Sequence, residues 1–258
     1  PAYVNRTLPV VSSWQVRPPR HSDRAVLTMV QALDPKEADF VAYVVRASLR
    51  RLGPRWALLV LYGRDADRDA LHLKLGSPDS VHWLPIVLDG VRRHEVLYNE
   101  MAWFRVSLDF WESVPAEFEH LLFLEGDSMV LRGHGCVESF LDFAYVGAPW
   151  KDGLGLPAFG GNGGLSLRRR SLCTAAVAHW HAAKTQAERR REFNLAMGED
   201  VLTCRLLQDM GQAFPSRESA ANFSVETVYR PGPCGFHKPW EWLPPHAVAD
   251  LFASAEMG

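Results

Sequence analysis

Two carboxylates close a short apolar run near the middle of the sequence. The run at 120–124 is followed by Glu125, Gly126 and Asp127. An apolar run of this length, bounded by polar residues, is typical of a strand buried on both faces. Acidic groups at the carboxyl end of such a strand lie where open α/β sheets bind ligands, and the i, i+2 spacing can direct both toward one divalent cation. The pattern predicts a metal site, and a loop-capping pair of carboxylates is the alternative.

Three later segments carry further groups that could do chemistry. Glu199 and Asp200 open a predicted helix, where one carboxylate could cap the first turn and the other could act as a general base. The glycine-dense segment 160–164 would let a backbone approach a ligand closely, or would form a bulged strand. It lacks the Gly-Lys-Ser/Thr of a phosphate-binding loop. His237 lies in a predicted loop at 235–240, where a histidine packs more often than it binds a ligand.

Basic and aromatic residues offer weaker signals. The arginine runs at 168–170 and 189–191 could offset a diphosphate, but we favour solvated helix ends. Nine tryptophans are present, and those in predicted loops could stack on a base or a sugar, although core packing is the default. These loop residues are Trp111, Trp150 and Trp240.

Alternating strands and helices must position these groups. Strands are expected at 25–30, 56–62, 81–88, 120–124 and 223–229. Helices are expected at 34–52, 95–110, 171–184 and 199–210, the first starting at Asp34-Pro35. Pro85 indicates that the third strand lies at an edge, because proline cannot donate to a ladder. The rhythm implies right-handed βαβ units and a mainly parallel sheet.

Length and composition set the outer limits. The 258 residues are 47% hydrophobic and 22% charged, which suits one large α/β domain or two small ones. A net charge of −2 gives no global signal for nucleic acid or an anionic membrane, so we predict no nucleic-acid partner. No run approaches the roughly 18 apolar residues that a membrane span needs.

Cysteine usage and the first residues bear on the compartment. The four cysteines form no CxxC pair, and we predict reduced thiols: Cys136, Cys173, Cys204 and Cys234. Residues 1–22 are expected to be an extended lead-in without a signal-peptide pattern. These features favour the cytoplasm, with the lumen of the secretory pathway as the alternative if an upstream anchor was removed.

Taken in order, the motifs resemble a glycosyltransferase-like family, labelled DUF5672 and related to the GT-A glycosyltransferases. The similarity covers about residues 90–240. It rests on Tyr98-Asn99, Phe110-Trp111-Glu112-Ser113-Val114-Pro115, Glu125-Gly126-Asp127-Ser128, Tyr145-Val146-Gly147-Ala148-Pro149-Trp150, Gly160-Gly161-Asn162-Gly163-Gly164-Leu165-Ser166-Leu167-Arg168, Glu199-Asp200-Val201, Phe223-Ser224-Val225-Glu226 and Gly235-Phe236-His237-Lys238-Pro239-Trp240.

The resemblance implies an α/β fold, namely a single GT-A-like, Rossmann-type domain with a mainly parallel central sheet flanked by helices. The domain would span 23–258. Its nucleotide-binding half would cover about 23–131 and its acceptor half about 132–245.

The resemblance also implies a nucleotide-sugar donor, with a UDP-sugar favoured, and Mn²⁺ or Mg²⁺ held by an acidic DxD-type motif. Glu125 stands where the family usually has the first Asp, so Asp127 is the better-supported metal ligand. His237 matches the C-terminal histidine that completes the metal shell in many such enzymes. The residues assigned to donor or acceptor binding are Glu125, Asp127, Trp150, Gly161, Asn162, Gly163, Gly164 and Lys238.

Glu199-Asp200-Val201 resembles the acidic pair with which inverting GT-A enzymes deprotonate the acceptor. We expect Asp200 to be the base, with Glu199 as the second choice. The predicted function is metal-dependent sugar transfer, with inversion, to a carbohydrate or another hydroxyl acceptor. A cation would offset charge on the leaving diphosphate while a carboxylate activates the hydroxyl.

Two other functions are carried as alternatives. Because Glu125 replaces the first Asp of the motif, one alternative is a module that binds a nucleotide sugar without catalysis. Gly126-Asp127-Ser128-Met129 also resembles the nucleophile block of GDSL-type esterases, but no Asp-x-x-His follows Ser128 in the sequence. The sequence leaves open the choice between inversion and retention, the sugar, the nucleobase, the acceptor and the oligomeric state.

Overall fold

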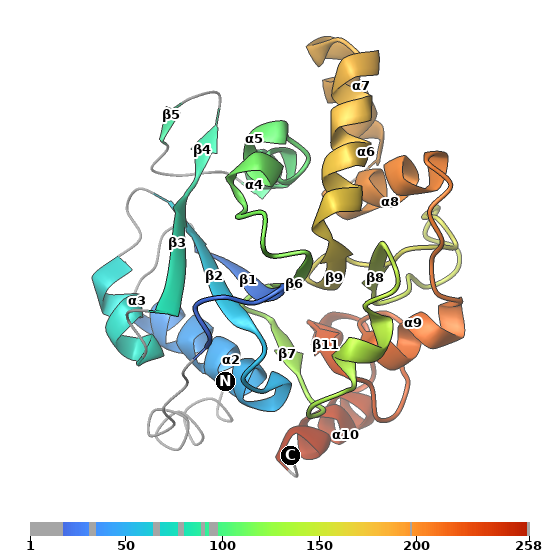
Figure 1. Cartoon of the computed structure of the whole chain (residues 1–258). Coiled ribbons are helices and arrows are strands. Elements are labelled where there is room, and N and C mark those ends of the chain that lie inside the picture. Colours follow the sequence, from blue (N-terminus) through green and yellow to red (C-terminus); the bar gives the residue numbers. More distant parts are fainter. Residues whose placement is uncertain are drawn as a thin grey trace.

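A six-stranded sheet forms the centre of the molecule (Figure 1). The computed structural model describes residues 18–30, 35–63, 68–76, 80–88, 91–92, 98–196 and 198–256. In spatial order the strands are β3 (Val81–Pro85), β2 (Ala57–Tyr62), β1 (Arg24–Val30), β6 (His120–Leu124), β9 (Leu165–Arg169) and β8 (Tyr145–Gly147). The expected strands around 25–30, 56–62 and 120–124 are confirmed, and β3 lies at an edge as Pro85 indicated.

Strand direction explains how distant segments meet. β3, β2, β1 and β6 are parallel, whereas β9 runs antiparallel to both β6 and β8. Leu124, the last residue of β6, pairs with Leu165, the first residue of β9. The residues that precede β9 therefore lie beside those that follow β6, and the Glu125 amide donates to the Gly164 carbonyl (2.9 Å). The antiparallel strand thus brings the glycine-rich segment against the acidic turn.

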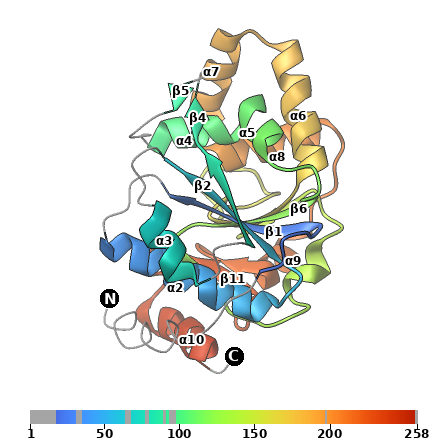
Figure 2. The ribbon, with the colours of Figure 1, turned by 60° about the vertical axis from the view of Figure 1, so that its left-hand side comes forward.

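Helices cover both faces of the sheet (Figure 2). One core contains side chains from α2 (Pro35–Leu52), α3 (Arg68–Leu75), α9 (Arg217–Phe223) and α10 (Pro245–Glu256). The other contains side chains from α4 (Tyr98–Arg105), α5 (Leu108–Ser113), α6 (Arg170–Ala183), α7 (Gln186–Ala196) and α8 (Glu199–Asp209). Along β1, Val26 packs in the first core and Leu27 in the second. The sheet is buried on both faces, as the apolar runs predicted.

A small second sheet carries His237. Its strands are β10 (Ser224–Val225), β11 (Gly235–His237) and β7 (Ser128–Val130), and β4 (Val87–Leu88) pairs separately with β5 (Val91–Arg92). Two short 3₁₀ helices, η2 (Val137–Phe140) and η3 (Pro239–Glu241), complete the elements. The loop expected at 235–240 is wrong for its first three residues, because they pair antiparallel with β7 and place His237 opposite Ser128.

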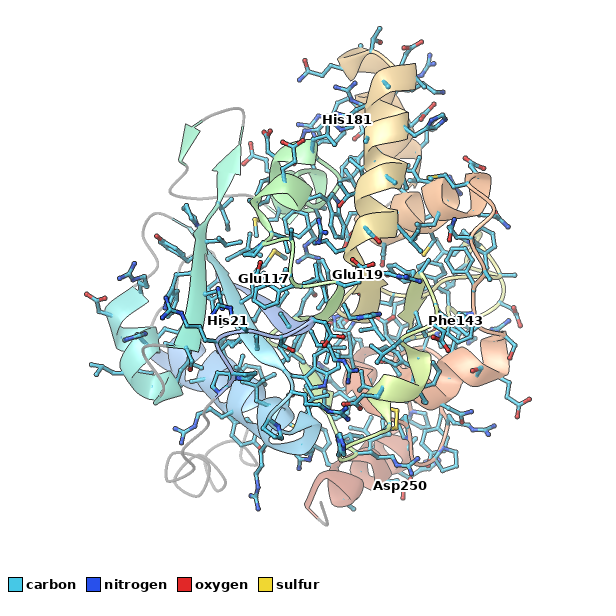
Figure 3. The ribbon with its side chains drawn as sticks, in the orientation of Figure 1. His21, Glu117, Glu119, Phe143, His181 and Asp250 are labelled. Carbon is cyan, nitrogen blue, oxygen red and sulfur yellow. A yellow bond between two sulfur atoms is a disulfide. The ribbon has the colours of Figure 1, made fainter. Side chains whose placement is uncertain are left out.

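Cys136 and Cys234 form a disulfide beyond the other end of the β7–β11 pair, with their Cα atoms 5.6 Å apart (Figure 3). Nearby, the Leu131 and Arg132 amides donate to the Cys234 carbonyl, at 2.7 and 3.2 Å. The prediction of reduced thiols was wrong for this pair, because a separation of 98 residues carries no local signal. Cys173 and Cys204 are free and buried.

Two expected elements differ from the structure. The helix expected at 95–110 is divided into α4 and α5, because Ser107 accepts a hydrogen bond from the Phe110 amide (3.2 Å) and caps a new helix. The strand expected at 223–229 is reduced to β10, because Phe223 ends α9. The expected helices at 171–184 and 199–210 are confirmed as α6 and α8.

Some expectations fall outside the described residues, among them most of the lead-in, the Asp34 cap and the start of the helix expected at 95. Among the helices of the described ranges, none combines the length and the apolarity needed to cross a bilayer.

Candidate active site

One cleft of about 550 Å³ collects most of the predicted site residues. Those that line it are Glu125, Trp150, Asn162, Gly163, Gly164, Glu199, Asp200, His237 and Lys238. Asp127 adjoins the cleft through its contact with His237. Gly161 lies behind the lining, where a Cβ would meet the backbone of Gly147. The carboxyl end of β6, the segment before β9, the start of α8 and the end of β11 therefore converge.

Glu125, Asp127 and His237 offer ligand atoms that all lie within 4.8 Å of one another. The His237 Nε2 atom is 3.2 Å from Asp127 Oδ1 and 3.4 Å from Glu125 Oε2. Pairing of β11 with β7 sets this geometry, and the Lys238 amide donates to the Asp127 carbonyl at 2.9 Å. Among the described residues neither ring nitrogen of His237 makes a well-formed hydrogen bond although both are buried, and a cation between the two carboxylates would satisfy Nε2. Two carboxylates and an imidazole form a fitting donor set for Mn²⁺ or Mg²⁺.

Glu226 holds the other side of the His237 ring. Its Oε1 atom lies 3.1 Å from His237 Nδ1, and both side chains are buried. Burial disfavours the imidazolium, but the three surrounding carboxylates outweigh it and raise the pKa of His237 to about 11. A carboxylate on the remote nitrogen is the usual partner of a metal-binding histidine. Sequence reasoning missed Glu226, although an acid directly after a short buried strand was the available signal.

Arg105, the last residue of α4, links the acidic turn to α8. Its Nη1 atom lies 2.7 Å from Glu125 Oε1 and 3.2 Å from Glu199 Oε1. Burial opposes ionisation of Glu125, but Arg105 outweighs it and, with His237, holds the pKa of that carboxyl well below its usual range. Sequence reasoning missed Arg105, because nothing in an amphipathic helix shows which charge faces a cleft.

Arg168 and Glu199 form a buried bidentate pair, with both N–O distances 2.8 Å. The Arg168 guanidinium also lies over the Phe123 ring, 3.8 Å from its centroid. Burial opposes ionisation of Glu199, and Arg168 outweighs it and lowers the pKa of this carboxyl. The expectation that 168–170 is a solvated helix end was wrong for Arg168, because this residue lies in β9 and the face opposite Leu165 and Leu167 is also covered.

Asp200 differs from its neighbour in charge environment. Its Oδ2 atom accepts a hydrogen bond from the Gly163 amide (2.9 Å) and its Oδ1 from the Val201 amide (2.8 Å). Burial, and then the negative charge of Glu199, raise the pKa of Asp200 to about 6. Of the two acids, Asp200 is therefore the one poised to exchange a proton near neutral pH. Neither caps α8 from the Ncap position, which Gly198 occupies.

The two glycines before β9 are required by close approach. A Cβ at Gly164 would overlap the His237 ring, and one at Gly163 would lie 2.8 Å from Glu199 Oε1. The Asn162 side chain accepts from the Gly164 amide at 2.7 Å, which holds the segment in place. The glycine-rich segment thus separates the acidic–histidine group from Asp200 with backbone alone.

Lys238 and Ser128 complete the described site. Lys238 has a φ of +28°. Among the described residues it is the only one other than glycine with a positive φ. Such a backbone costs on the order of 1–3 kcal/mol and is found mostly where function requires it. Ser128 is buried and its hydroxyl donates to the Gly164 carbonyl (2.8 Å), so it is occupied structurally rather than presented as a nucleophile.

Residues 96–237 match the profile of a family described as "Protein of unknown function (DUF5672)". The match covers more than half of the 258 residues. The chain belongs to the DUF5672 family. This confirms the resemblance carried by its motifs. No curated protein matches the sequence significantly.

Solved structures similar to this DUF5672 chain include glycosyltransferases. The apo-form glycosyltransferase GlyE of Streptococcus pneumoniae TIGR4 has a TM-score of 0.52 and 14% identity, over 91% of this chain and 60% of GlyE. Mouse xyloside xylosyltransferase 1 has a TM-score of 0.46 and 10% identity, over 90% of this chain and 92% of that one. This chain spans about 60% of the length of GlyE. The fold is the expected GT-A-like α/β domain with a mainly parallel sheet.

The DUF5672 match ends at His237 and so includes the acidic turn, the glycine-rich segment and Asp200. Two other residues of the cleft, Lys238 and Trp242, follow directly after it.

Proposed function

We propose that this DUF5672 protein is a divalent-cation-dependent glycosyltransferase that acts with inversion. Its donor would be a nucleotide sugar, with a UDP-sugar favoured, and its acceptor a carbohydrate or another hydroxyl compound. The observation that carries the proposal is the presence, in one cleft, of the Glu125–Asp127–His237 group and of Asp200, whose pKa is about 6. The fold, which resembles that of the glycosyltransferase GlyE, supports the same class.

Asp127, His237 and Glu125 would hold Mn²⁺ or Mg²⁺. When bound, the ion stabilises negative charge that develops on the departing nucleoside diphosphate. Glu226 lies on the Nδ1 side of His237, and Nε2 faces the two carboxylates. Because Arg105 contacts Oε1 of Glu125, Oε2 is the oxygen left for the ion.

The remaining predicted residues would bind the donor and the acceptor. Lys238 supplies a point charge for the donor diphosphate from the same turn that carries His237. Asn162, Gly163 and Gly164 form the wall between the cation group and Asp200, Gly161 supports that wall, and Trp150 lines the cleft beside it. In this arrangement the nucleotide-binding half (about 23–131) supplies the acidic turn and the acceptor half (about 132–245) supplies Asp200.

Asp200 would act as the general base. It accepts the proton of the acceptor hydroxyl while the acceptor oxygen forms a bond to the anomeric carbon. The bond from that carbon to the diphosphate oxygen breaks on the opposite side, which inverts the configuration. Glu199 does not share this role, since both its oxygens are engaged by Arg168. It instead holds the start of α8 in place.

The direct test is hydrolysis of UDP-sugars, followed as UDP release with Mn²⁺ and then with EDTA. We expect turnover that EDTA abolishes and that Asp127→Ala and Asp200→Asn each reduce strongly. Unchanged binding and turnover in Asp127→Ala would remove the metal assignment. UDP-sugar binding without any turnover in the native protein would instead favour the non-catalytic binding module.

A serine-directed fluorophosphonate probe tests the esterase alternative. Because Ser128 is 1% exposed and hydrogen-bonded, we expect no labelling. Labelling at Ser128 would revive hydrolase chemistry.

The compartment belongs to the same proposal. The cytoplasm was favoured on the expectation of reduced thiols, whereas a Cys136–Cys234 disulfide is typical of an oxidising compartment. We therefore propose an oxidising compartment, of which the secretory-pathway lumen is an example.

A further inference from the structure

Trp242 exposes its indole at the cleft. The side chain is 50% exposed and lines the same cleft as Asp200. Its backbone is fixed by the turn after η3, where the Trp242 and Leu243 amides donate to the Pro239 carbonyl at 3.2 and 2.9 Å. A large apolar side chain held at the lining of a polar cleft is typical of a ligand contact.

Trp240 provides the contrast within the same turn. It is 47% exposed, nearly as much as Trp242. Its ring, however, is stacked on Phe252, with centroids 6.5 Å apart and planes 19° apart, and it meets Phe236 edge-on. Trp240 does not line the cleft. Its ring has a structural role in packing against α10, so Trp240 serves as a control of similar exposure for Trp242.

Leu154 adds a second apolar side chain from a different segment. It is 38% exposed and lines the cleft. Its two neighbours in the sequence, Gly153 and Gly155, have φ values of +84° and +70°. The base of this loop is anchored, since the Lys151 amide donates to Thr227 Oγ1 at 2.8 Å. A loop with a fixed base and a glycine-flanked apolar tip can close on a ligand that lies against Trp242.

The chemistry of the cleft restricts that ligand. Among the described acids that line it, Glu125, Glu199 and Glu226 are paired with Arg105, Arg168 and His237, whereas Asp200 has no ion pair. An acceptor with an anionic group beside the reacting hydroxyl would therefore be repelled by Asp200. The ligand must also present a hydroxyl to Asp200 while it covers an indole and a leucine. An uncharged pyranose meets both requirements, because its C–H face is apolar and its rim carries hydroxyls. An aliphatic alcohol has no such flat face.

From this combination we infer that Trp242 and Leu154 bind the apolar face of a neutral pyranose. Naming that pyranose the acceptor rests on the proposed function. The binding site itself rests on the two exposed side chains and on the charge of the cleft.

The test measures binding rather than turnover. Methyl glucoside, methyl galactoside and methyl rhamnoside are titrated by saturation-transfer NMR into the full chain with Mn²⁺ and UDP present. At least one should bind, and butane-1,4-diol at the same concentration should not. Trp242→Ala should weaken binding about tenfold, equivalent to about 1.4 kcal/mol, within the range of an aromatic contact. Trp242→Phe should retain most of the affinity, and Trp240→Ala should stay within about twofold of the native protein.

The inference is overturned if no pyranoside binds or if the diol binds equally well. It is also overturned if Trp242→Ala weakens the binding of UDP and not of the pyranoside, because the indole would then contact the nucleobase. The proposed function fails separately. Pyranoside binding without UDP-sugar turnover would remove the transferase and keep the sugar site. EDTA-sensitive hydrolysis of a UDP-sugar without pyranoside binding would keep the transferase and remove the sugar site.

Discussion

Arg105 lies 2.7 Å from Glu125, and the same guanidinium nitrogen lies 3.2 Å from Glu199. The residue at the end of α4 therefore connects the acidic turn with the first residue of α8. With Arg168 beyond Glu199 and His237 beyond Glu125, charges of alternating sign cross the floor of the cleft. Removal of one buried member leaves its partners uncompensated, so effects of variants here are expected to be coupled.

The first prediction concerns pH. Asp200 has a pKa of about 6 and acts as a base only when deprotonated, so activity should fall about tenfold per pH unit below pH 6. Asp200→Asn should abolish this acidic limb and lower kcat by about 10²–10⁴. UDP release measured between pH 4.5 and 8 checks this. A native profile that is flat across that range would contradict the assignment.

The second prediction concerns Glu199→Gln. Because the charge of Glu199 contributes to the raised pKa of Asp200, its removal should move the acidic limb to lower pH. The same variant leaves Arg168 without its bidentate partner, at a cost of about 3–5 kcal/mol in the free energy of unfolding. A pH–rate profile and a urea titration measure the two effects, with exposed Glu112→Gln as the control. An unmoved limb would mean that the two carboxylates are not coupled.

The third prediction concerns the support of His237. Glu226→Gln should weaken Mn²⁺ binding about 10–100-fold while leaving the fold intact, because the imidazole loses the carboxylate that orients it. Isothermal titration calorimetry with MnCl₂ measures the change. Asp142→Asn, an exposed residue outside the cleft, should bind Mn²⁺ as the native chain does. Equal affinities for Glu226→Gln and the control would show that Glu226 does not act through His237.

The fourth prediction concerns Gly164→Ala. The added methyl would overlap the His237 ring, so the ring must move, at a cost of about 1–3 kcal/mol in stability and with a loss of Mn²⁺ affinity. At Gly133 a Cβ would meet its nearest neighbour, the Arg51 carbonyl, at an ordinary 3.9 Å. Gly133→Ala should therefore change neither thermal stability nor Mn²⁺ binding appreciably. Native-like Mn²⁺ affinity in Gly164→Ala would place the imidazole elsewhere.

The fifth prediction concerns the disulfide. Reduction should lower the free energy of unfolding by about 2–5 kcal/mol, because Cys136 and Cys234 close a long loop. A thermal melt with and without tris(2-carboxyethyl)phosphine measures the effect. The Cys136→Ser/Cys234→Ser double variant should melt like the reduced native chain and should not respond to the reductant. A response in that variant would trace the effect to the buried thiols instead.

Local patterns predicted what depends on neighbours in sequence. The apolar run before Glu125 specified a buried strand, whereas the glycine density at 160–164 left open a close backbone approach and a bulged strand. The roles of Arg105 and Glu226 were hidden, because their partners are distant in the sequence. Arg105 contacts Glu125 and Glu199, and Glu226 contacts His237. Arg168 shows the limit. Alternation puts Arg168 on the face opposite Leu165 and Leu167, which the default assigns to solvent. That face is covered by the second core, and a charge there needs a partner that the local pattern does not reveal.

The β7–β11 ribbon has a consequence for the evolution and engineering of the chain. The polypeptide leaves the ribbon and reaches Cys136, and it returns to the ribbon after Cys234. The residues between the two cysteines therefore form an insertion whose ends are joined by the disulfide. That insertion carries Asp200 and Leu154, while Glu125, Asp127 and His237 lie outside it. Exchange of this segment between family members, cut at the two cysteines, would replace Asp200, Leu154 and Glu226 together and would leave the three cation ligands and Trp242 of the recipient chain in place.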